Sequence, residues 1–421
     1  MKWQHYQWYP DFPTKQLRAT QPPLPDVEGI FRAVEEKGDE ALYELTQRYD
    51  GVKLSALRVS EAEIHAAQVP PALAEAIHAA YENIWNFHFR QLPQEIVVET
   101  QRGVLCGLRY VPIARVGLYV PGGTAPLISS VLMLGIPAKI AGVPQIVLAT
   151  PPSSNGKIHE ALLYAARICG ISEVYAVGGA QAIAALTIGT QSIPAVDKIA
   201  GPGNRFVQAA KLEAARRGVA IDMPAGPSEV IVLADSTAHP EWIAADLIAQ
   251  AEHGSDSLVG LITTDAELIP AVEMAIKDLL SHNPRRAYAE ETLNHSWSLT
   301  VPDILTGIQI VNAVAPEHLI LACEKPECYL SHLRQVGSVF LGHLTPESAG
   351  DYASGTNHVL PTGGMARSFG SLTVLSFMRS FTYQQLNPEG VKALTPAVLH
   401  LAEAEGLLGH AESMRLRYAA I

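Results

Sequence analysis

Apolar residues recur at helical spacing through the N-terminal third of the chain. In residues 27–51 and 58–93 they lie three and four positions apart, which is the pattern of an amphipathic helix with one buried face. Ser60 is followed three positions later by Glu63, as in a capping box at a helix start. We therefore predict that helices dominate this third.

Short apolar, β-branched runs replace the helical pattern in the middle of the chain. Between residues 114 and 217 the runs ARVGLYV, QIVLAT, EVYAVGG and KIAG are each followed by a turn and a helical pattern. This alternation predicts a parallel sheet with crossover helices. The theme starts again near residue 229 with EVIVLAD and SLVGLITT, followed by helices predicted over 240–252 and 266–280, and the chain ends in a helical pattern. The predicted fold class is α/β, with two Rossmann-like domains on incomplete parallel sheets and small helical segments at both ends.

Composition narrows the range of partners. The 421 residues include 30 Lys and Arg against 42 Asp and Glu, a formal net charge of -12, which disfavours binding to nucleic acid or an anionic membrane and suits a small cationic substrate better. The four cysteines form no C-x-x-C pair, so a reducing compartment is expected. The N-terminus lacks a signal-peptide core, and prolines break the most apolar window, 131–150. We expect a soluble, cytoplasmic protein.

Three glycine turns follow predicted strands, at Pro121–Thr124, Gly178–Gln181 and Gly201–Asn204. Glycine lets the backbone approach phosphate at the carboxyl ends of parallel strands, where helix N-termini add a positive dipole. Tyr119 could cover a flat ring, and Gln181 and Asn204 could bind ribose or phosphate. Strand-to-helix turns also need glycine for conformational reasons alone, and Asn204 is an ordinary helix cap. The turns leave a nucleotide site and a purely structural role both open.

The stretch QAEHGSDS follows the predicted helix 240–252. Gln250 and His253 lie three positions apart and so share a helix face, whereas Glu252 points elsewhere. Such an N/O pair suits a divalent metal, but a histidine before glycine is also common at a helix C-terminus, where it interacts with the dipole.

Three further polar groups are candidates for chemistry. Glu317 and His318 follow Pro316 in what we predict to be the first turn of a helix, an ordinary helix start that could also divide acid and base duties. Residues 347–364 contain Asp351 and His358 among four glycines, which favours a loop built around a site. Glu405 and His410 are five apart, so they converge only if Gly406 or Gly409 breaks the helix; a surface pair is the alternative.

Taken together, these motifs resemble the histidinol dehydrogenase family. The strings VGLYVPGGTAPL, VGGAQAIAAL, KIAGPGNRFV, IDMPAGPSEVIVLAD, QAEHGSDS, APEHLIL, GDYASGTNHVLPT and EGLLGHAESMRLR occur in that family's order and spacing, from about residue 25 to the end. The resemblance implies a zinc-dependent, homodimeric enzyme of histidine biosynthesis that oxidises L-histidinol through L-histidinal to L-histidine with two NAD in sequence. It also implies that the terminal segments pack in the dimer.

The resemblance assigns roles to individual residues. It implies zinc ligands at Gln250, His253, Asp351 and, from the partner subunit, His410. The acid/base pair would be Glu317 and His318, and the NAD contacts Tyr119, Gln181 and Asn204. Substrate contacts would come from Ser228 and Glu405, together with His318 and the four metal ligands.

The expected organisation divides the chain into four parts. Residues 1–24 form an N-terminal segment, 25–116 with 229–372 form the domain of the zinc and acid/base residues, 117–228 form the NAD-binding domain, and 373–421 form a helical tail that reaches the partner subunit. A zinc hydrolase of a small cationic substrate is the alternative function, because the same ligands could activate water. A catalytically silent nucleotide-binding module is a further alternative, and would need no acid/base pair.

Overall fold

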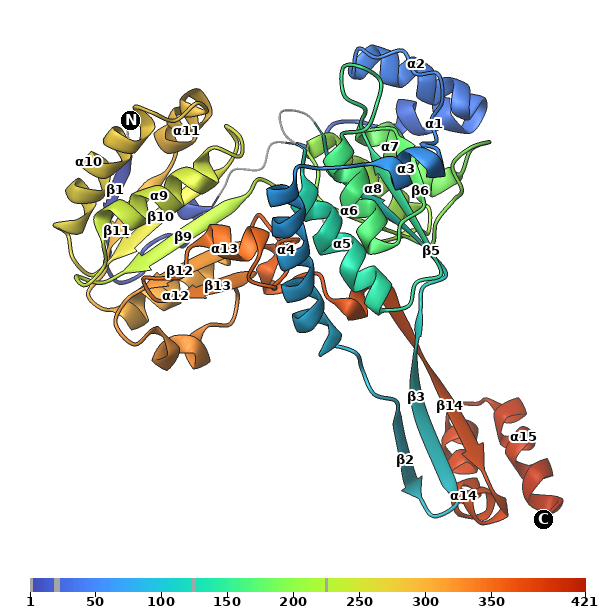
Figure 1. Ribbon diagram of the computed structural model, residues 1–421. Helices are drawn as coiled ribbons and strands as arrows, with labels where there is room; N and C mark the ends of the chain where they lie inside the picture. Colours follow the sequence, from blue (N-terminus) through green and yellow to red (C-terminus); the bar gives the residue numbers. More distant parts are fainter. Residues whose placement is uncertain (1–2, 19–22, 123–125, 224–225) are drawn as a thin grey trace.

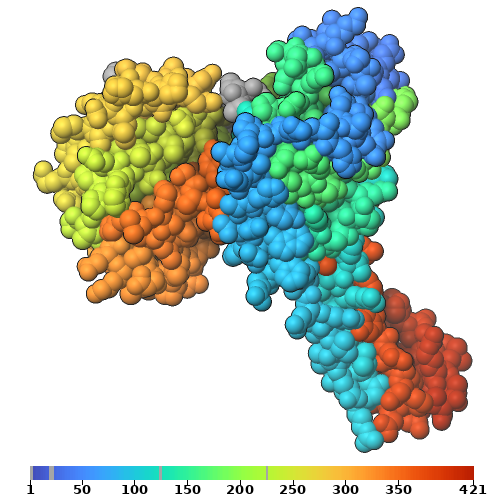
Figure 2. Space-filling view, viewed as in Figure 1, coloured from blue at the N-terminus to red at the C-terminus, as the bar shows by residue number. Residues whose placement is uncertain are grey.

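The computed structural model describes residues 3–18, 23–122, 126–223 and 226–421. It contains two parallel sheets, each covered by helices, and a three-stranded antiparallel stalk that projects away from both (Figure 1). The space-filling view shows the two lobes in contact, with the stalk and the C-terminal helices extending from one of them (Figure 2).

The five-stranded sheet is formed by residues of the middle of the chain. Its strands are β4 (Arg115–Tyr119), β5 (Gln145–Thr150), β6 (Glu173–Ala176), β7 (Lys198–Ala200) and β8 (Ala220–Ile221), in the order β6-β5-β4-β7-β8. The helices between them are α5 (Ile128–Ile140), α6 (Glu160–Cys169), α7 (Gly179–Ile188) and α8 (Arg205–Arg216). All pairs are parallel. The strand order reverses between β4 and β7, which is the topological switch point of a Rossmann-like sheet.

The six-stranded sheet repeats this topology. Its order is β1-β11-β10-β9-β12-β13, with every pair parallel. The strands are β9 (Glu229–Ala234), β10 (Leu258–Thr263), β11 (Trp297–Thr300), β12 (His318–Ala322), β13 (Ser338–Leu341) and the edge strand β1 (Gln4–Gln7), and the helices are α9 (Pro240–Ala251), α10 (Leu268–Leu280), α11 (Arg286–Asn294), α12 (Ile304–Val314) and α13 (Glu347–Tyr352). The predicted fold class of two Rossmann-like units is confirmed. Of its strands only β9 and β10 were predicted; β1, β11 and β13 were not, and the segment of β12 was predicted as a helix.

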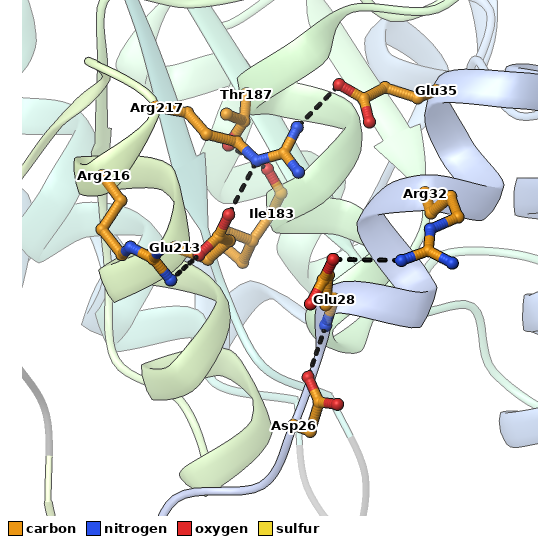
Figure 3. A network of polar contacts seen from close by, with 9 residues as sticks. All are labelled: Asp26, Glu28, Arg32, Glu35, Ile183, Thr187, Glu213, Arg216 and Arg217. Atoms are coloured by element: carbon orange, nitrogen blue, oxygen red, sulfur yellow. Dashed lines mark hydrogen bonds and ion pairs between the residues drawn. The ribbon is translucent and has the colours of Figure 1, made fainter.

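The N-terminal helices pack on the five-stranded sheet. They are α1 (Glu28–Lys37), α2 (Asp39–Tyr49), α3 (Glu61–Ala66) and α4 (Pro71–Phe89), and the predicted capping box is present at Ser60. Phe31 of α1 is fully buried in one core with strands β4 to β7. The guanidinium of Arg217, just after α8, lies 4.8 Å from the ring centre of Phe31. It also lies 2.7 Å from a carboxylate oxygen of Glu35 (Figure 3).

Residues 25–116 were expected to form one domain with residues 229–372. Their helices share a core with residues 116–223, and the same core includes Val359 and Leu372. A helical period shows which face of a helix is buried, but not which sheet covers it.

The stalk is an antiparallel sheet. One of its strands lies within residues 373–421, which were predicted as a helical tail, so that prediction is wrong for this strand. Strand β3 (Val104–Pro112) pairs with β2 (Ile96–Gln101) and with β14 (Met378–Leu386). Helices α14 (Pro388–Ala404) and α15 (Leu408–Ala419) then pack against each other at its end (Figure 1). The short 3-10 helices are η1 (Thr14–Leu17), η2 (Pro326–His332), η3 (Met365–Arg367) and η4 (Val374–Phe377). In the described ranges, no helix combines the length and the apolar character needed to cross a membrane.

Candidate active site

The glycine turns of the five-stranded sheet meet around Tyr119, at the end of β4. The Gly179 amide donates to Tyr119 Oη at 3.0 Å, and Gly201 is so close that a Cβ atom there would lie 2.0 Å from the Tyr119 carbonyl oxygen. Gly122 and Gly178 both lie against Pro151, which follows β5, so that a Cβ atom at either position would overlap with the proline ring. Gly123 and Thr124 of the first predicted turn lie outside the described residues. The described parts of the three turns therefore occupy one edge of the sheet, at and beside its switch point.

Asn204 and Gln181 stand at the starts of two helices on this edge. Asn204 caps α8, since its Oδ1 accepts from the amides of Phe206 at 3.0 Å and Val207 at 3.2 Å. Capping uses only the side-chain oxygen, so the amide nitrogen is left to face a ligand. Gln181 in the first turn of α7 is buried.

A cavity joins this edge to the six-stranded sheet. Its volume is about 220 Å³, and its lining includes Asn204 and Gln208 of α8 on one side and Ser228, His253 and Asp256 on the other. Three residues predicted for different roles, Asn204, Ser228 and His253, thus border a single space.

Gln250 and His253 lie at the C-terminal end of α9, as predicted. Gln250 Nε2 is 3.4 Å from His253 Nδ1, and Gln250 is fully buried. Its Oε1 atom has no hydrogen-bond partner among the described residues. Glu252 points away and accepts from Asn283 at 2.9 Å.

Glu317 and His318 lie at the start of strand β12, so the predicted helix start at this position is wrong. Ala315 takes a left-handed conformation after α12, and five consecutive buried residues from His318 then pair with β9 and β13. The following apolar run HLILA therefore continues as a buried strand. Glu317 Oε2 accepts from the Glu229 amide at 3.0 Å, and His318 Nδ1 lies 3.3 Å from the Glu229 carbonyl oxygen.

Two acidic residues of α13 complete a group that could hold a metal ion. Within the described part of the chain, one group of three or more His, Cys, Asp or Glu side chains has ligand atoms that all lie within 4.8 Å of one another. Its members are His318, Glu347 and Asp351. His318 Nδ1 is 3.5 Å from Glu347 Oε1, and His318 Nε2 is 3.6 Å from Asp351 Oδ1. The pKa of His253 is lowered, chiefly by desolvation, while Asp351 raises it and His318 lowers it further.

The tail residues are not part of this group within one chain. Glu405 follows the last residue of α14, and Gly406 with φ +73° breaks the helix before His410 in α15. Both side chains are exposed, and α14 and α15 lie at the far end of the stalk from α9 and α13 (Figure 1). The helix break that we required occurs, but a single chain does not bring Glu405 or His410 to the cleft.

Comparison with known proteins gives the family. The sequence pattern of the family "Histidinol dehydrogenase" matches residues 15–418. The histidinol dehydrogenase of Shewanella oneidensis is 50% identical over 408 residues, covering 94% of this chain and 92% of the relative, and that of Colwellia psychrerythraea is 47% identical over 397 residues, covering 93% and 91%. The crystal structure of histidinol dehydrogenase from Elizabethkingia anophelis superposes with a TM-score of 0.96 at 44% identity, covering 99% of this chain and 98% of that chain.

The chain belongs to the histidinol dehydrogenase family. It is therefore an oxidoreductase, an enzyme of histidine biosynthesis, and the resemblance noted in its sequence is confirmed.

The cleft beside the start of β12 contains several buried acids. Burial raises the pKa of Glu317 to about 7 and the pKa values of Glu229 and Glu347 to about 8. Burial alone would lower the pKa of His318, but the carboxylates of Glu347, Glu317 and Asp351 outweigh it and raise that pKa to about 10. So many buried acids around one imidazole favour a cationic occupant.

Two acids in this cleft, Glu229 and Glu347, were missed from the sequence. Glu347 lies four positions before Asp351 on α13, a spacing that puts both on one helix face, so this signal was available. Glu229 opens a wholly buried strand, where a charged residue is rare without a partner or a function. His358, noted but given no role, contacts the cluster through Asp351: its Nδ1 donates to the Asp351 carbonyl at 2.8 Å.

Proposed function

We propose that this chain oxidises L-histidinol to L-histidine through bound L-histidinal, using two NAD in sequence and a zinc ion. One observation carries the proposal: a single cavity is bordered by Asn204 at the switch-point edge of the five-stranded sheet and by Ser228 and His253 at the amino edge of the six-stranded sheet. The His318, Glu347 and Asp351 group lies at the start of β12 on that same amino edge. This arrangement supports a nucleotide site next to a cation site, as a dehydrogenase of an amino alcohol requires.

The five-stranded sheet is the better candidate for NAD. Open parallel sheets bind dinucleotides beyond the carboxyl ends of their strands at the switch point, which here lies between Tyr119 and the turn Gly201–Asn204. At the equivalent crevice of the six-stranded sheet, the carboxylate of Asp235 already accepts hydrogen bonds from the protein itself. This carboxylate accepts from Thr237 and from the Glu324 amide at 2.9 Å, bridging β9 and β12. We therefore assign Tyr119, Gln181 and Asn204 to NAD binding.

The residues of the cleft fit a divalent metal. Gln250, His253 and Asp351 supply nitrogen and oxygen donors of the kind that zinc accepts, and the unpartnered Oε1 of Gln250 is consistent with an absent ligand. When bound, zinc would hold the amine and imidazole of L-histidinol and orient its alcohol carbon.

His410 of the partner subunit would be the fourth ligand, and Glu405 of the partner subunit a substrate contact. The stalk and tail expose apolar side chains that a second copy would cover, among them Ile96, Val97, Val98, Leu401 and Leu408, each at least 48% exposed. Exposed apolar patches of this kind mark interaction surfaces. A homodimer with shared active sites would complete the ligand set.

His318 and Glu317 would move the protons. Because a carbonyl oxygen only accepts, the contact with Glu229 requires the proton on His318 Nδ1, which leaves Nε2 as the base. A bound metal ion and the cationic substrate would counter the carboxylates that raise the pKa of His318. Nε2 of the neutral imidazole would then take the hydroxyl proton as hydride leaves for the first NAD. Glu317, whose pKa lies at about 7, then takes a proton from the water that attacks the aldehyde, and the second hydride leaves for the second NAD.

The cysteines do not offer an alternative nucleophile. Cys323 follows the carboxyl end of β12, five residues from His318, which is roughly 16 Å along a strand. Burial raises its pKa to about 12, so the thiolate is scarce. Cys106 is in β3 of the stalk, Cys169 ends α6, and Cys328 is in η2, further along the chain from the carboxyl end of β12. Water is therefore the proposed nucleophile, with Ser228 beside it as a substrate contact at the cavity.

A spectrophotometric assay with L-histidinol and NAD, before and after chelation, tests the proposal. We expect two NADH per L-histidinol in the zinc-loaded protein and loss of the signal after chelation. The zinc hydrolase alternative would give no absorbance rise at the NADH wavelength, and no NADH from the zinc-loaded protein would overturn the reading.

A further inference from the structure

An ion pair is buried beneath the Gly201–Asn204 turn. Lys211 of α8 and Asp222, one residue after β8, form a salt bridge, and each side chain is only 1% exposed. Burial of two charges is expensive, and an apolar pair of similar size is often as stable. The pair therefore calls for an explanation other than stability.

Both ions bind the backbone of one residue, Gly201. Lys211 Nζ donates to the Gly201 carbonyl oxygen at 3.0 Å, and the Gly201 amide donates to Asp222 Oδ2 at 2.7 Å. Gly201 has φ +135° and lies against the backbone of Tyr119. An apolar pair could fill the same volume but could make neither hydrogen bond.

The same carboxylate also holds the start of the connection between the two sheets. Asp222 Oδ1 accepts from the Met223 amide at 2.7 Å, and the Asp222 amide donates to the Ile199 carbonyl of β7 at 3.2 Å. The chain then runs from Met223 to Ser228 and the first residue of β9. Asp222 therefore links the turn that carries Asn204 to the segment that carries Ser228.

We propose that Lys211 and Asp222 are positioning residues for NAD: they hold Gly201 by its N–H and C=O, so that Tyr119 and Asn204 present a preformed dinucleotide site. This rests on the proposed function in one respect, the placing of NAD at this turn. The pair touches neither NAD nor L-histidinol and acts through the turn.

Three variants separate positioning from stability. Lys211→Met breaks the pair, Lys211→Met with Asp222→Leu replaces both ions by apolar side chains, and Leu162→Ala destabilises the same lobe from α6, away from the turn. KM for NAD, KM for L-histidinol, kcat and the melting temperature are measured for each, with NADH binding followed by its fluorescence.

Lys211→Met is expected to raise KM for NAD about tenfold or more, because misplacement of a binding group by about 1 Å has effects of this size, while KM for L-histidinol stays unchanged. The double variant should regain melting temperature but keep the raised KM for NAD. Leu162→Ala should melt earlier with normal KM for NAD. The inference is overturned if KM for NAD recovers together with stability in the double variant or, should that variant not fold, if Lys211→Met and Leu162→Ala have the same KM for NAD.

The outcomes also separate this inference from the proposed function. If the wild type forms no NADH from L-histidinol, the proposed function fails, and NADH binding to the wild type and to Lys211→Met still decides the role of the pair. If the wild type is active and Lys211→Met binds NAD normally, only the positioning role fails.

Discussion

Substituting alanine for Gly201 tests whether the third glycine turn carries NAD. Gly201 has φ +135°, and a Cβ atom there would lie 2.0 Å from the Tyr119 carbonyl oxygen and 3.2 Å from the Tyr119 nitrogen. Backbone atoms cannot rotate away as a side chain does, so the turn and the end of β4 have to separate by about 1 Å to restore an ordinary contact. Gly218→Ala is a matched control, because Gly218 also has a positive φ, of +91°, but a Cβ atom there meets nothing within 4 Å.

Both variants place alanine at a positive φ, but only Gly201→Ala also brings a Cβ atom into overlap with neighbouring backbone atoms. Alanine at these positive φ values is strained in both proteins, at a cost of about 1–3 kcal/mol. Overlap in a packed region adds about 1–3 kcal/mol for Gly201→Ala alone. Because a displacement of about 1 Å at a binding group can reduce turnover by as much as 100-fold, we expect Gly201→Ala to raise KM for NAD by about 10- to 100-fold and Gly218→Ala to leave it unchanged.

Steady-state NADH formation at saturating L-histidinol measures the effect, and thermal melting measures the shared strain. Equal KM values for NAD in the two alanine variants would refute the reasoning, because they would mean that the contact between Gly201 and Tyr119 does not shape the dinucleotide site.

Three further predictions concern the acid/base pair, the tail and the buried acids. Glu317→Gln should retain NADH formation coupled to the alcohol step and lose about 10²- to 10⁴-fold in oxidation of added L-histidinal; full aldehyde turnover with a lost alcohol step would show that the roles are wrong. Inactive His410→Ala and inactive His318→Asn should recover about a quarter of wild-type activity when dissociated, mixed and reassociated, because half of the randomly formed dimers are mixed and each has one intact site; no recovery would exclude shared sites. Burial raises the pKa of Glu229 to about 8 and that of Asp246 to about 7, well above their unfolded values of about 4, so their contribution to stability is complete below pH 4 and is lost as the pH rises through 7 and 8. The melting temperature of the metal-free wild type should therefore fall over this range more steeply than that of Glu229→Gln, and equal slopes would contradict the assignment.

The α/β class, strands β4 to β7, β9 and β10, and the α9 end of the site were predictable, because local signals specify them. The buried β-branched runs predicted these strands. The spacing of Gln250 and His253 predicted a shared face, and their 3.4 Å contact confirms it. The partner strand of β3 lies about 270 residues along the chain at β14, so no local pattern identifies the pairing. The strands themselves left a signal: Phe381 and Tyr383 alternate with polar residues in β14, as strand residues do.

The segment of Glu317 and His318 was predicted as a helix start, because the residues that precede it are compatible with the start of either a helix or a strand. Pro316 followed by an acid is typical of a first helical turn, yet the left-handed Ala315 and the buried run after it make a strand. The cluster with Glu347 could not be inferred from β12 alone, since it depends on how α13 packs at the amino end of the sheet.

The two sheets meet by opposite edges, and this gives the cleft two electrostatic walls. On one side α7 and α8 begin, at Gly179 and Arg205, and helix N-termini carry partial positive charge that favours phosphate. On the other side α9 ends at Ala251 and α12 at Val314, and helix C-termini carry partial negative charge that favours cations. The buried acids, when ionised, add to the negative charge on this second side of the cleft. An anionic dinucleotide and a cationic amino alcohol would therefore each be attracted to a different wall of one cavity, which orients the two reactants before any side chain contacts them.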